Sequence, residues 1–162
     1  MKSKAKVVVI GGGVVGVSTL YHLAKKGWSD VVLCERKELT SGSTWHAAGL
    51  MPLFNMSYSV GQIHKYSVKF YQELEKETGQ DVGFREVSNI RLAENQDRMD
   101  EYRQYAGVAE TIGVKVNFLT PEEIQKAWPL CSIDGLVGAI QHPEDGYIPV
   151  SYTHLRAHET SL

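Results

Sequence analysis

The sequence predicts an α/β fold that begins with a strand–helix–strand unit of the dinucleotide-binding kind. Residues 5–10 (AKVVVI) are β-branched and lead into a glycine-rich turn. A helical stripe of apolar residues follows over 14–26, and a second apolar strand, 31–35 (VVLCE), comes after Gly27. Apolar β-branched runs bounded by glycine are typical of buried parallel strands, and the three elements together have the length of one βαβ unit.

The rest of the chain alternates between helices and short strands. Residues 36–57 lack periodicity and are rich in serine, threonine and glycine, so we expect a long loop with room for a short helix. The further expected elements are a helix at 58–78, one or two short strands at 84–93, a helix at 95–112, a strand at 114–119, a short helix after Thr120, and a strand at 136–141 that leads into a turn from His142 to Gly146. Thr120, Pro121 and Glu123 predict a capping box at the start of the short helix.

Composition is that of an ordinary globular protein of about one domain, with 162 residues, 43% of them hydrophobic and 22% charged. The formal charge of −2 gives no reason to expect nucleic acid or an anionic membrane as a partner. No apolar stretch reaches the roughly 18 residues of a membrane span. Cys34 and Cys131 are typical of reduced thiols, and no metal-binding set is apparent. We expect a cytoplasmic protein, or a matrix protein in a eukaryote, although no transit peptide is recognisable.

The strongest motif is a GxGxxG pattern, Gly11-Gly12-Gly13-Val14-Val15-Gly16, at the junction of the first strand and helix. Gly11 is expected to make the tight turn, Gly13 to let the backbone approach a pyrophosphate, and Gly16 to let helix and strand pack closely. Amide groups at the helix N-terminus would then hold the phosphate charge.

An acidic residue completes the motif. Glu35 stands 19 residues beyond Gly16, close to the roughly 20 that dinucleotide-binding folds use for the acid that accepts the ribose hydroxyls. This acid predicts FAD or NAD rather than NADP, although Arg36 beside it is able to accommodate a 2′-phosphate. The alternative interpretation is a structural glycine turn with a surface glutamate.

A second segment, TSGSTWHAAGL at 40–50, follows closely. Its small residues allow close approach to a ligand, and its hydroxyl groups supply hydrogen-bond donors. Taken alone, His46 in this segment could be an ordinary loop histidine whose ring is satisfied by backbone groups.

These two segments resemble the amine-oxidising flavoproteins of the D-amino-acid-oxidase superfamily, the dimethylglycine and sarcosine dehydrogenases in particular. The resemblance runs over residues 5–149, through LTPEEIQKAWPL and HPEDGYIP. It implies FAD as the cofactor, bonded covalently at its 8α carbon to His46, and no catalytic residue within these 162. The cofactor-binding residues expected from motif and resemblance together are Gly11, Gly13, Val14, Val15, Gly16, Glu35, Arg36, Gly42, Ser43, Thr44, Trp45, His46, Ala47, Ala48, Gly49 and Leu50.

The resemblance also implies a reaction. Hydride transfer from an N-methyl carbon of dimethylglycine or sarcosine to the flavin would give an iminium, which is hydrolysed to formaldehyde or captured by tetrahydrofolate. The implied partners are a small-molecule amine and an electron-transfer flavoprotein. Two alternatives remain open, a non-catalytic regulatory relative of the same fold and an NAD-dependent oxidoreductase.

Members of this family are much longer, so we expect a truncated chain that is inactive alone. Residues 1–57 would begin a Rossmann-like FAD-binding domain, and 58–149 would be an incomplete remainder that reaches into an α+β substrate domain. Any tetrahydrofolate-binding region would lie beyond them. From Val150 the family pattern is lost, and residues 150–162 look like a translated sequencing adapter, with a divergent natural tail as the alternative.

Overall fold

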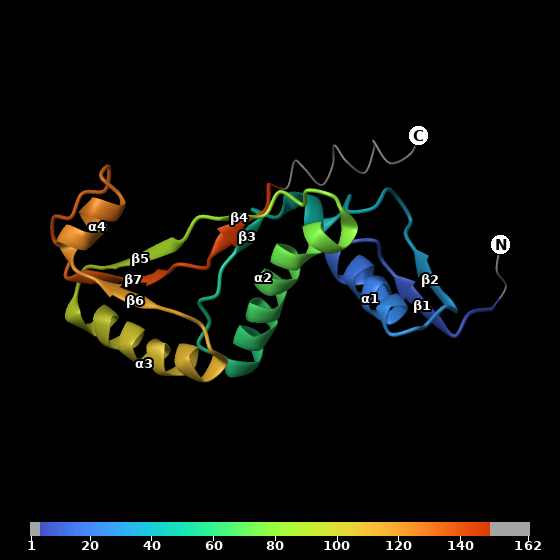
Figure 1. Cartoon of the computed structure of the whole chain (residues 1–162), viewed down its shortest axis with the longest axis horizontal. Helices are drawn as coiled ribbons and strands as arrows, with labels where there is room; N and C mark the ends of the chain where they lie inside the picture. Colours follow the sequence, from blue (N-terminus) through green and yellow to red (C-terminus); the bar gives the residue numbers. More distant parts are fainter. Residues whose placement is uncertain (1–3, 150–162) are drawn as a thin grey trace. The chain divides into compact units, whose positions relative to one another are not determined.

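The computed structural model describes residues 4–149, so the expectation for residues 150–162 lies outside the described residues. The chain forms two compact units that divide between Ala48 and Gly49. Figure 1 shows their elements in chain order. No helix in the described part of the chain is long and apolar enough to cross a membrane.

The first unit contains the expected strand–helix–strand arrangement. Its elements are β1 (Val7–Ile10), α1 (Val14–Lys25), β2 (Val31–Cys34) and the 3-10 helix η1 (Ser43–His46). The two strands pair in parallel, with Val7 opposite Val31 and Ile10 opposite Cys34. The α/β prediction is therefore confirmed, and η1 is the short helix for which the loop had room.

Both strands are shorter than the sequence predicted. The backbone N–H of Gly11 donates to the carbonyl of Cys34 at 2.8 Å, and this bond closes the ladder where the glycine turn begins. Glu35 therefore lies immediately after β2 rather than within it. On one face of β1, the side chains of Val8 and Ile10 are 53% and 88% exposed, so this apolar face is uncovered.

Over its described residues, 49–149, the second unit contains three helices and two small antiparallel sheets. Its elements are β3 (Leu50–Met51), α2 (Tyr58–Thr78), β4 (Arg85–Glu86), β5 (Asn89–Ala93), α3 (Gln96–Ile112), β6 (Asn117–Leu119), α4 (Pro121–Ala127), β7 (Gly138–His142) and β8 (Gly146–Tyr147). The strand orders are β3-β8-β4 and β5-β7-β6. Antiparallel sheets with separate helices agree with the predicted α+β character of this part.

Local sequence signals explain the helices. Helix α2 has the predicted bounds, because the Ser57 hydroxyl accepts from the N–H of Val60 and Gly79 takes the left-handed conformation (φ 69°) that ends a helix. Helix α4 begins with the predicted capping box, in which Thr120 and Glu123 each bond the other's backbone N–H.

Strands β3 and β8 were not predicted, and they explain where the units divide. Leu50 pairs with Tyr147, and the N–H of Ile148 donates to the carbonyl of Gly49 at 2.8 Å. Leu53 is only 2% exposed within the second unit. The start of the 49–57 stretch, assigned from sequence to the first domain, is thus held by the second unit.

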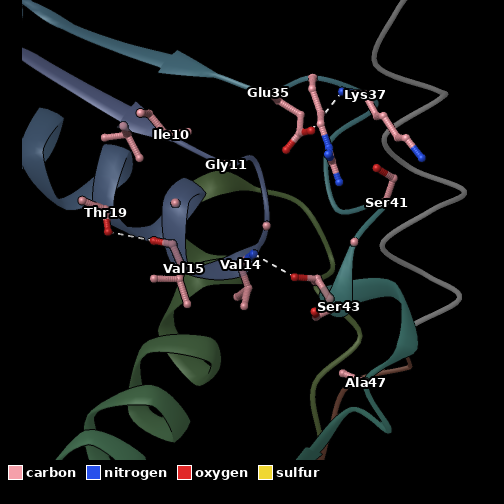
Figure 2. Close-up of a pocket in the computed structure, with 16 residues that line it drawn as sticks. Ile10, Gly11, Val14, Val15, Thr19, Glu35, Lys37, Ser41, Ser43 and Ala47 are labelled. Atoms are coloured by element: carbon pink, nitrogen blue, oxygen red, sulfur yellow. Dashed lines mark hydrogen bonds between the residues drawn. The ribbon is translucent and has the colours of Figure 1, made fainter.

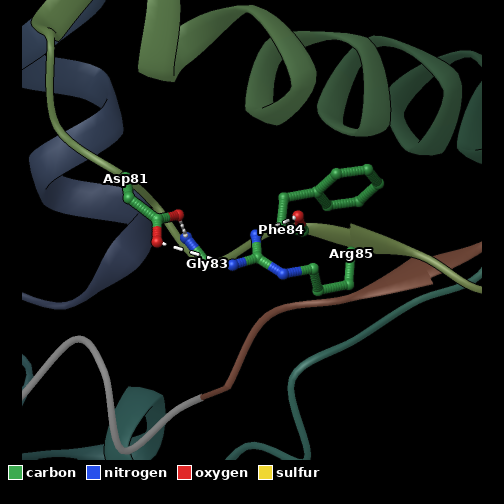
Figure 3. A network of polar contacts seen from close by, with 4 residues as sticks. All are labelled: Asp81, Gly83, Phe84 and Arg85. Carbon is green, nitrogen blue, oxygen red and sulfur yellow. Dashed lines mark hydrogen bonds and ion pairs between the residues drawn. The ribbon is translucent and has the colours of Figure 1, made fainter.

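Strand β8 also fits tightly against β4. A Cβ on Gly146 would lie 2.6 Å from the carbonyl oxygen of Arg85 and 2.6 Å from the ring of Phe84. Figure 3 shows the loop before β4, where Asp81 accepts from the N–H of Gly83 at 2.7 Å and pairs with Arg85 at 3.5 Å. These contacts fix the entry to β4 beside the glycine.

The core of the second unit lies between helices α2 and α3 and the β5-β7-β6 sheet. Its buried members are Leu53, Val68, Ala93, Met99, Tyr102, Tyr105, Ala109, Ile112, Val114 and Ile140. Tyr102 and Tyr105 therefore pack in the core.

Candidate functional site

In the glycine turn after β1, Gly11 and Gly16 have the roles that the motif predicts, a tight turn and close packing of helix and strand. Gly11 has a φ of +105°, which side chains rarely allow. A Cβ on Gly16 would lie 1.9 Å from the carbonyl oxygen of Gly11, so only glycine lets α1 approach the turn this closely.

Gly13 has a neighbour that the sequence did not indicate. It is the N-cap of α1, and a Cβ there would lie 3.1 Å from the hydroxyl oxygen of Thr44. The same hydroxyl accepts a hydrogen bond of 3.0 Å from the N–H of Val14. The Thr44 hydroxyl therefore occupies part of the space beside Gly13 in which we expected a pyrophosphate.

Glu35 is held by backbone groups on both carboxylate oxygens. Oε2 accepts from the N–H of Gly12 at 2.6 Å, and Oε1 accepts from the N–H of Lys37 at 2.9 Å. These backbone bonds, first that from Gly12, lower the pKa of Glu35. The carboxylate is thus ionised at neutral pH and fixed in direction, and its other lone pairs remain able to accept from hydroxyl groups.

These groups line one pocket of about 610 Å³ in the first unit, shown in Figure 2. The structure brings eleven of the expected residues to it: Gly11, Gly13, Val14, Val15, Gly16, Glu35, Arg36, Gly42, Ser43, Thr44 and Ala47. Five further lining residues were missed by sequence reasoning: Val9, Ile10, Thr19, Lys37 and Ser41. Alternation along β1 and the spacing of one helical turn from Val15 to Thr19 could have indicated some of them.

The other expected residues, Trp45, His46, Ala48, Gly49 and Leu50, are not among those that line this pocket. His46 ends η1 and is exposed, and its Nδ1 lies 3.0 Å from the carbonyl oxygen of Gly42. A carbonyl can only accept, so Nδ1 carries the proton and donates. In the neutral ring, Nε2 then keeps its lone pair.

A buried polar cluster in the second unit was not found from sequence. Nε2 of His142 lies 3.0 Å from the Tyr105 hydroxyl, which donates to the Leu53 carbonyl at 3.3 Å. Asp145 is 2% exposed and accepts from the N–H of Leu53 at 2.9 Å. We expected Asp145 to be a simple turn residue, but the segment HPEDG places two buried titratable side chains around that turn.

Burial shifts the pKa of each titratable member of this cluster toward its neutral form. It lowers the pKa of His142 to about 4, with a further lowering by the charge of Arg91. It raises the pKa of Asp145 to about 6 and that of Tyr105 to about 12. The cluster is buried beside the core of the second unit, because Tyr105 and Leu53 are core residues and His142 and Asp145 bond to them.

The residues of the first unit fit a dinucleotide. Gly13, the N-cap of α1, has no side chain to cap the helix, and Thr44 accepts only from the first amide, that of Val14, so the following amides of the first turn are suited to a phosphate. A fixed carboxylate follows β2, at the carboxyl end of the sheet where such folds bind their ligands. The pocket has the volume of ordinary ligand sites, about 300–1,000 Å³.

Fold and pocket together define a dinucleotide-binding α/β domain. A family model described as FAD dependent oxidoreductase (DAO) matches residues 6–158, and the chain belongs to this family.

Individual relatives agree with this assignment. Rat mitochondrial dimethylglycine dehydrogenase is 45% identical over 153 residues, which cover 94% of this chain and 18% of the rat protein. Human mitochondrial sarcosine dehydrogenase is 41% identical over 90% of this chain and 16% of its own length. The mouse mitochondrial pyruvate dehydrogenase phosphatase regulatory subunit is 35% identical over 91% of this chain and 17% of its own length. The chain thus spans less than a fifth of these relatives.

A solved structure is similar over nearly the whole chain. L-proline dehydrogenase from P. horikoshii matches with a TM-score of 0.85 at 25% identity, over 99% of this chain and 43% of that protein. The chain therefore corresponds to one region of these longer proteins and has the fold of the FAD dependent oxidoreductase (DAO) family.

Proposed function

We propose that this chain supplies the cofactor-binding region of an FAD-dependent dehydrogenase that oxidises an N-methylated amine, of the dimethylglycine or sarcosine type. The observation that carries the proposal is that the glycine turn, Glu35 and the 40–48 loop line one pocket. The substrate class follows from the names of the relatives at 45% and 41% identity.

Each part of the pocket has a role in holding FAD. The amide groups at the start of α1 would bind the pyrophosphate, and the carboxylate of Glu35 would accept from the ribose hydroxyls. Arg36 and Lys37 line the same pocket as Glu35 and would add positive charge for the phosphates. FAD, when bound, supplies an oxidised flavin that accepts a hydride from the N-methyl carbon.

His46 would tether the flavin. Its Nδ1–H donates to Gly42, so the lone pair of Nε2 is available to form a bond with the 8α carbon. The new Nε2–C bond replaces one hydrogen of the methyl group, and the ring, now bonded at Nε2, returns to its neutral form by releasing the proton on Nδ1. Two protons and two electrons leave, and dioxygen or another electron acceptor takes the electrons.

The regulatory subunit among the relatives favours a second candidate, a non-catalytic relative of the same fold. Such a protein has no need of a tethered flavin or of an amine substrate. The two candidates therefore differ in covalently bound flavin and in amine-dependent reduction, and both can be measured.

The test uses the longest native form of the protein that contains this chain, loaded with FAD. We expect flavin absorbance to remain in the acid-precipitated protein, on a peptide that contains His46. Dimethylglycine or sarcosine should reduce an electron-accepting dye. His46→Ala should release all flavin on precipitation, whereas His22→Ala, in α1 and outside the pocket lining, should retain it. Flavin that is absent or on another peptide would contradict the tether, and absence of amine-dependent dye reduction would favour the regulatory candidate.

A further inference from the structure

Two hydrogen bonds join the 40–48 loop to the glycine turn. The N–H of Thr40 donates to the carbonyl of Gly12 at 2.9 Å. The N–H of Val14 donates to the hydroxyl of Thr44 at 3.0 Å. The second bond occupies the first amide of α1, next to the amides of the same turn that would bind a phosphate.

The hydroxyl of Thr44 has further capacity. A threonine hydroxyl donates one hydrogen bond and accepts two, and here it accepts from Val14. Its proton therefore remains able to donate to an anionic oxygen, and Thr44 lines the pocket in which that oxygen would lie. One side chain can thus bond both the helix amide and a bound phosphate.

The same residue is close to His46 along the chain. Both lie in the single turn of η1, and the ring of His46 is held to Gly42, which precedes that turn. A 3-10 turn of four residues has little internal freedom, so a displacement of Thr44 displaces His46 with it.

We propose that Thr44 is a positioning residue that couples phosphate binding at the glycine turn to the placement of His46 for attachment to the flavin. This inference rests on the proposed function, because it assumes that His46 receives the flavin. Thr44 itself forms no bond to the flavin ring in this account. In this proposal it fixes the distance between the glycine turn, which would bind the phosphates, and His46, which would bond the flavin.

Gly13 gives a second means of testing the coupling, at saturating FAD because a Cβ there also narrows the approach of a pyrophosphate. A Cβ at Gly13 would lie 3.1 Å from the Thr44 hydroxyl oxygen, tighter than an ordinary contact. Gly13→Ala should therefore push Thr44 aside while the hydroxyl is retained. Thr44→Val removes the hydroxyl while the shape of the side chain is retained, and Thr44→Ser keeps the hydroxyl.

The experiment measures the rate of covalent attachment at saturating FAD in the longest native form. We expect the first-order rate constant to fall by about 10–100-fold in Thr44→Val and Gly13→Ala, because a misplacement of about 1 Å has effects of this size on bond formation. Thr44→Ser should restore most of the rate. Thr111→Val, an exposed threonine of α3 with a local bond to Val108, is the matched control and should react at the wild-type rate. Equal rates in wild type and Thr44→Val would overturn the coupling.

A second readout separates the coupling from the proposed function. Without FAD, hydrogen exchange at the Val14 amide should be faster in Thr44→Val than in wild type or Thr44→Ser, and His46 should react faster with diethyl pyrocarbonate. If wild type bears no covalent flavin, the tether is wrong, and these two rates decide whether Thr44 holds the loop. If neither rate changes in Thr44→Val, the coupling is wrong even where the tether is present.

Discussion

The carboxylate of Glu35 accepts a hydrogen bond of 2.6 Å from the backbone N–H of Gly12. Gly12 is buried, and a Cβ there would lie 2.6 Å from the side chain of Leu39 and 3.1 Å from Glu35 itself. The glycine turn and the acid after β2 are therefore one structural feature. In the proposed FAD site, an acid held in this way would already be in place for the ribose of a ligand whose phosphates bind the turn.

The first prediction concerns this acid. Glu35→Ala removes the acceptor for the ribose hydroxyls and the partner of two backbone amides, so ADP and FAD should bind about 10–100-fold more weakly, the range for bonds to a charged group. Calorimetric titration measures the change. Glu38→Ala, at an exposed neighbour, is the control and should bind as wild type does. Unchanged affinity in Glu35→Ala would show that this carboxylate does not contact the ligand.

The second prediction compares two glycines that differ in the space around them. Gly16→Ala places a Cβ 1.9 Å from the carbonyl oxygen of Gly11, so it should lower the free energy of unfolding of the first unit by about 1–3 kcal/mol or more. Gly107→Ala, in helix α3 with open space around it, should instead raise stability by about 0.5–1 kcal/mol. Thermal melts of the two variants should therefore shift in opposite directions from that of wild type.

Long elements with clear signals could be predicted from the sequence. Helix α2 has its predicted bounds because Ser57 and Gly79 stop it at both ends. Strands β3 and β8 were missed, since two residues show no periodicity and their pairing joins positions such as Leu50 and Tyr147 that are far apart in the chain.

In the candidate site, too, features set by nearby residues could be predicted and contacts between distant residues could not. The glycine turn and Glu35 could be placed because both belong to one continuous segment, β1 to β2, whose length fixes the spacing between them. The contact between Gly13 and Thr44 could not be predicted, because it depends on how the loop after β2 folds back onto the glycine turn. The burial of His142 likewise depends on tertiary packing around a turn that looks exposed in sequence.

The third prediction is a pH dependence with two opposing contributions. The pKa of Asp145 rises from 3.8 to about 6 on folding, so its contribution is present at low pH and is lost as pH rises through about 6. The pKa of His142 falls from 6.5 to about 4, so its contribution is present above 6.5 and is lost as pH falls through about 4. Wild type should therefore show little net change from these two groups between pH 4 and 6.5.

Single substitutions should reveal each contribution. The unfolding free energy of Asp145→Asn minus that of wild type should increase as pH rises from 4 to 6.5. The same difference for His142→Gln should decrease over that range. Each change should be at most about 3 kcal/mol, because a pKa shift of about two units corresponds to roughly this linkage free energy. Urea unfolding at several pH values measures both differences, and slopes of the same sign would contradict the account.

The fourth prediction concerns the tyrosines of the core. Tyr105→Phe leaves the Leu53 carbonyl and the Nε2 of His142 without their partner, so it should cost about 1–3 kcal/mol of unfolding free energy. Tyr102→Phe removes a single bond, to the carbonyl of Leu92, and should cost about 0.5–1.5 kcal/mol. Denaturant titrations of the two variants compare these costs, and a larger loss in Tyr102→Phe would show that the cluster around His142 is not a support of the fold.

We propose that the glycine turn and the 40–48 loop form one FAD site. Amide hydrogen exchange with and without FAD, in the longest native form that contains the chain, measures whether both segments bind the cofactor. We expect slower exchange on FAD addition in two segments at once, residues 11–16 and 42–47, with no comparable change in helix α3. Protection confined to other segments, or equal protection by NAD and FAD at the same concentration, would contradict it.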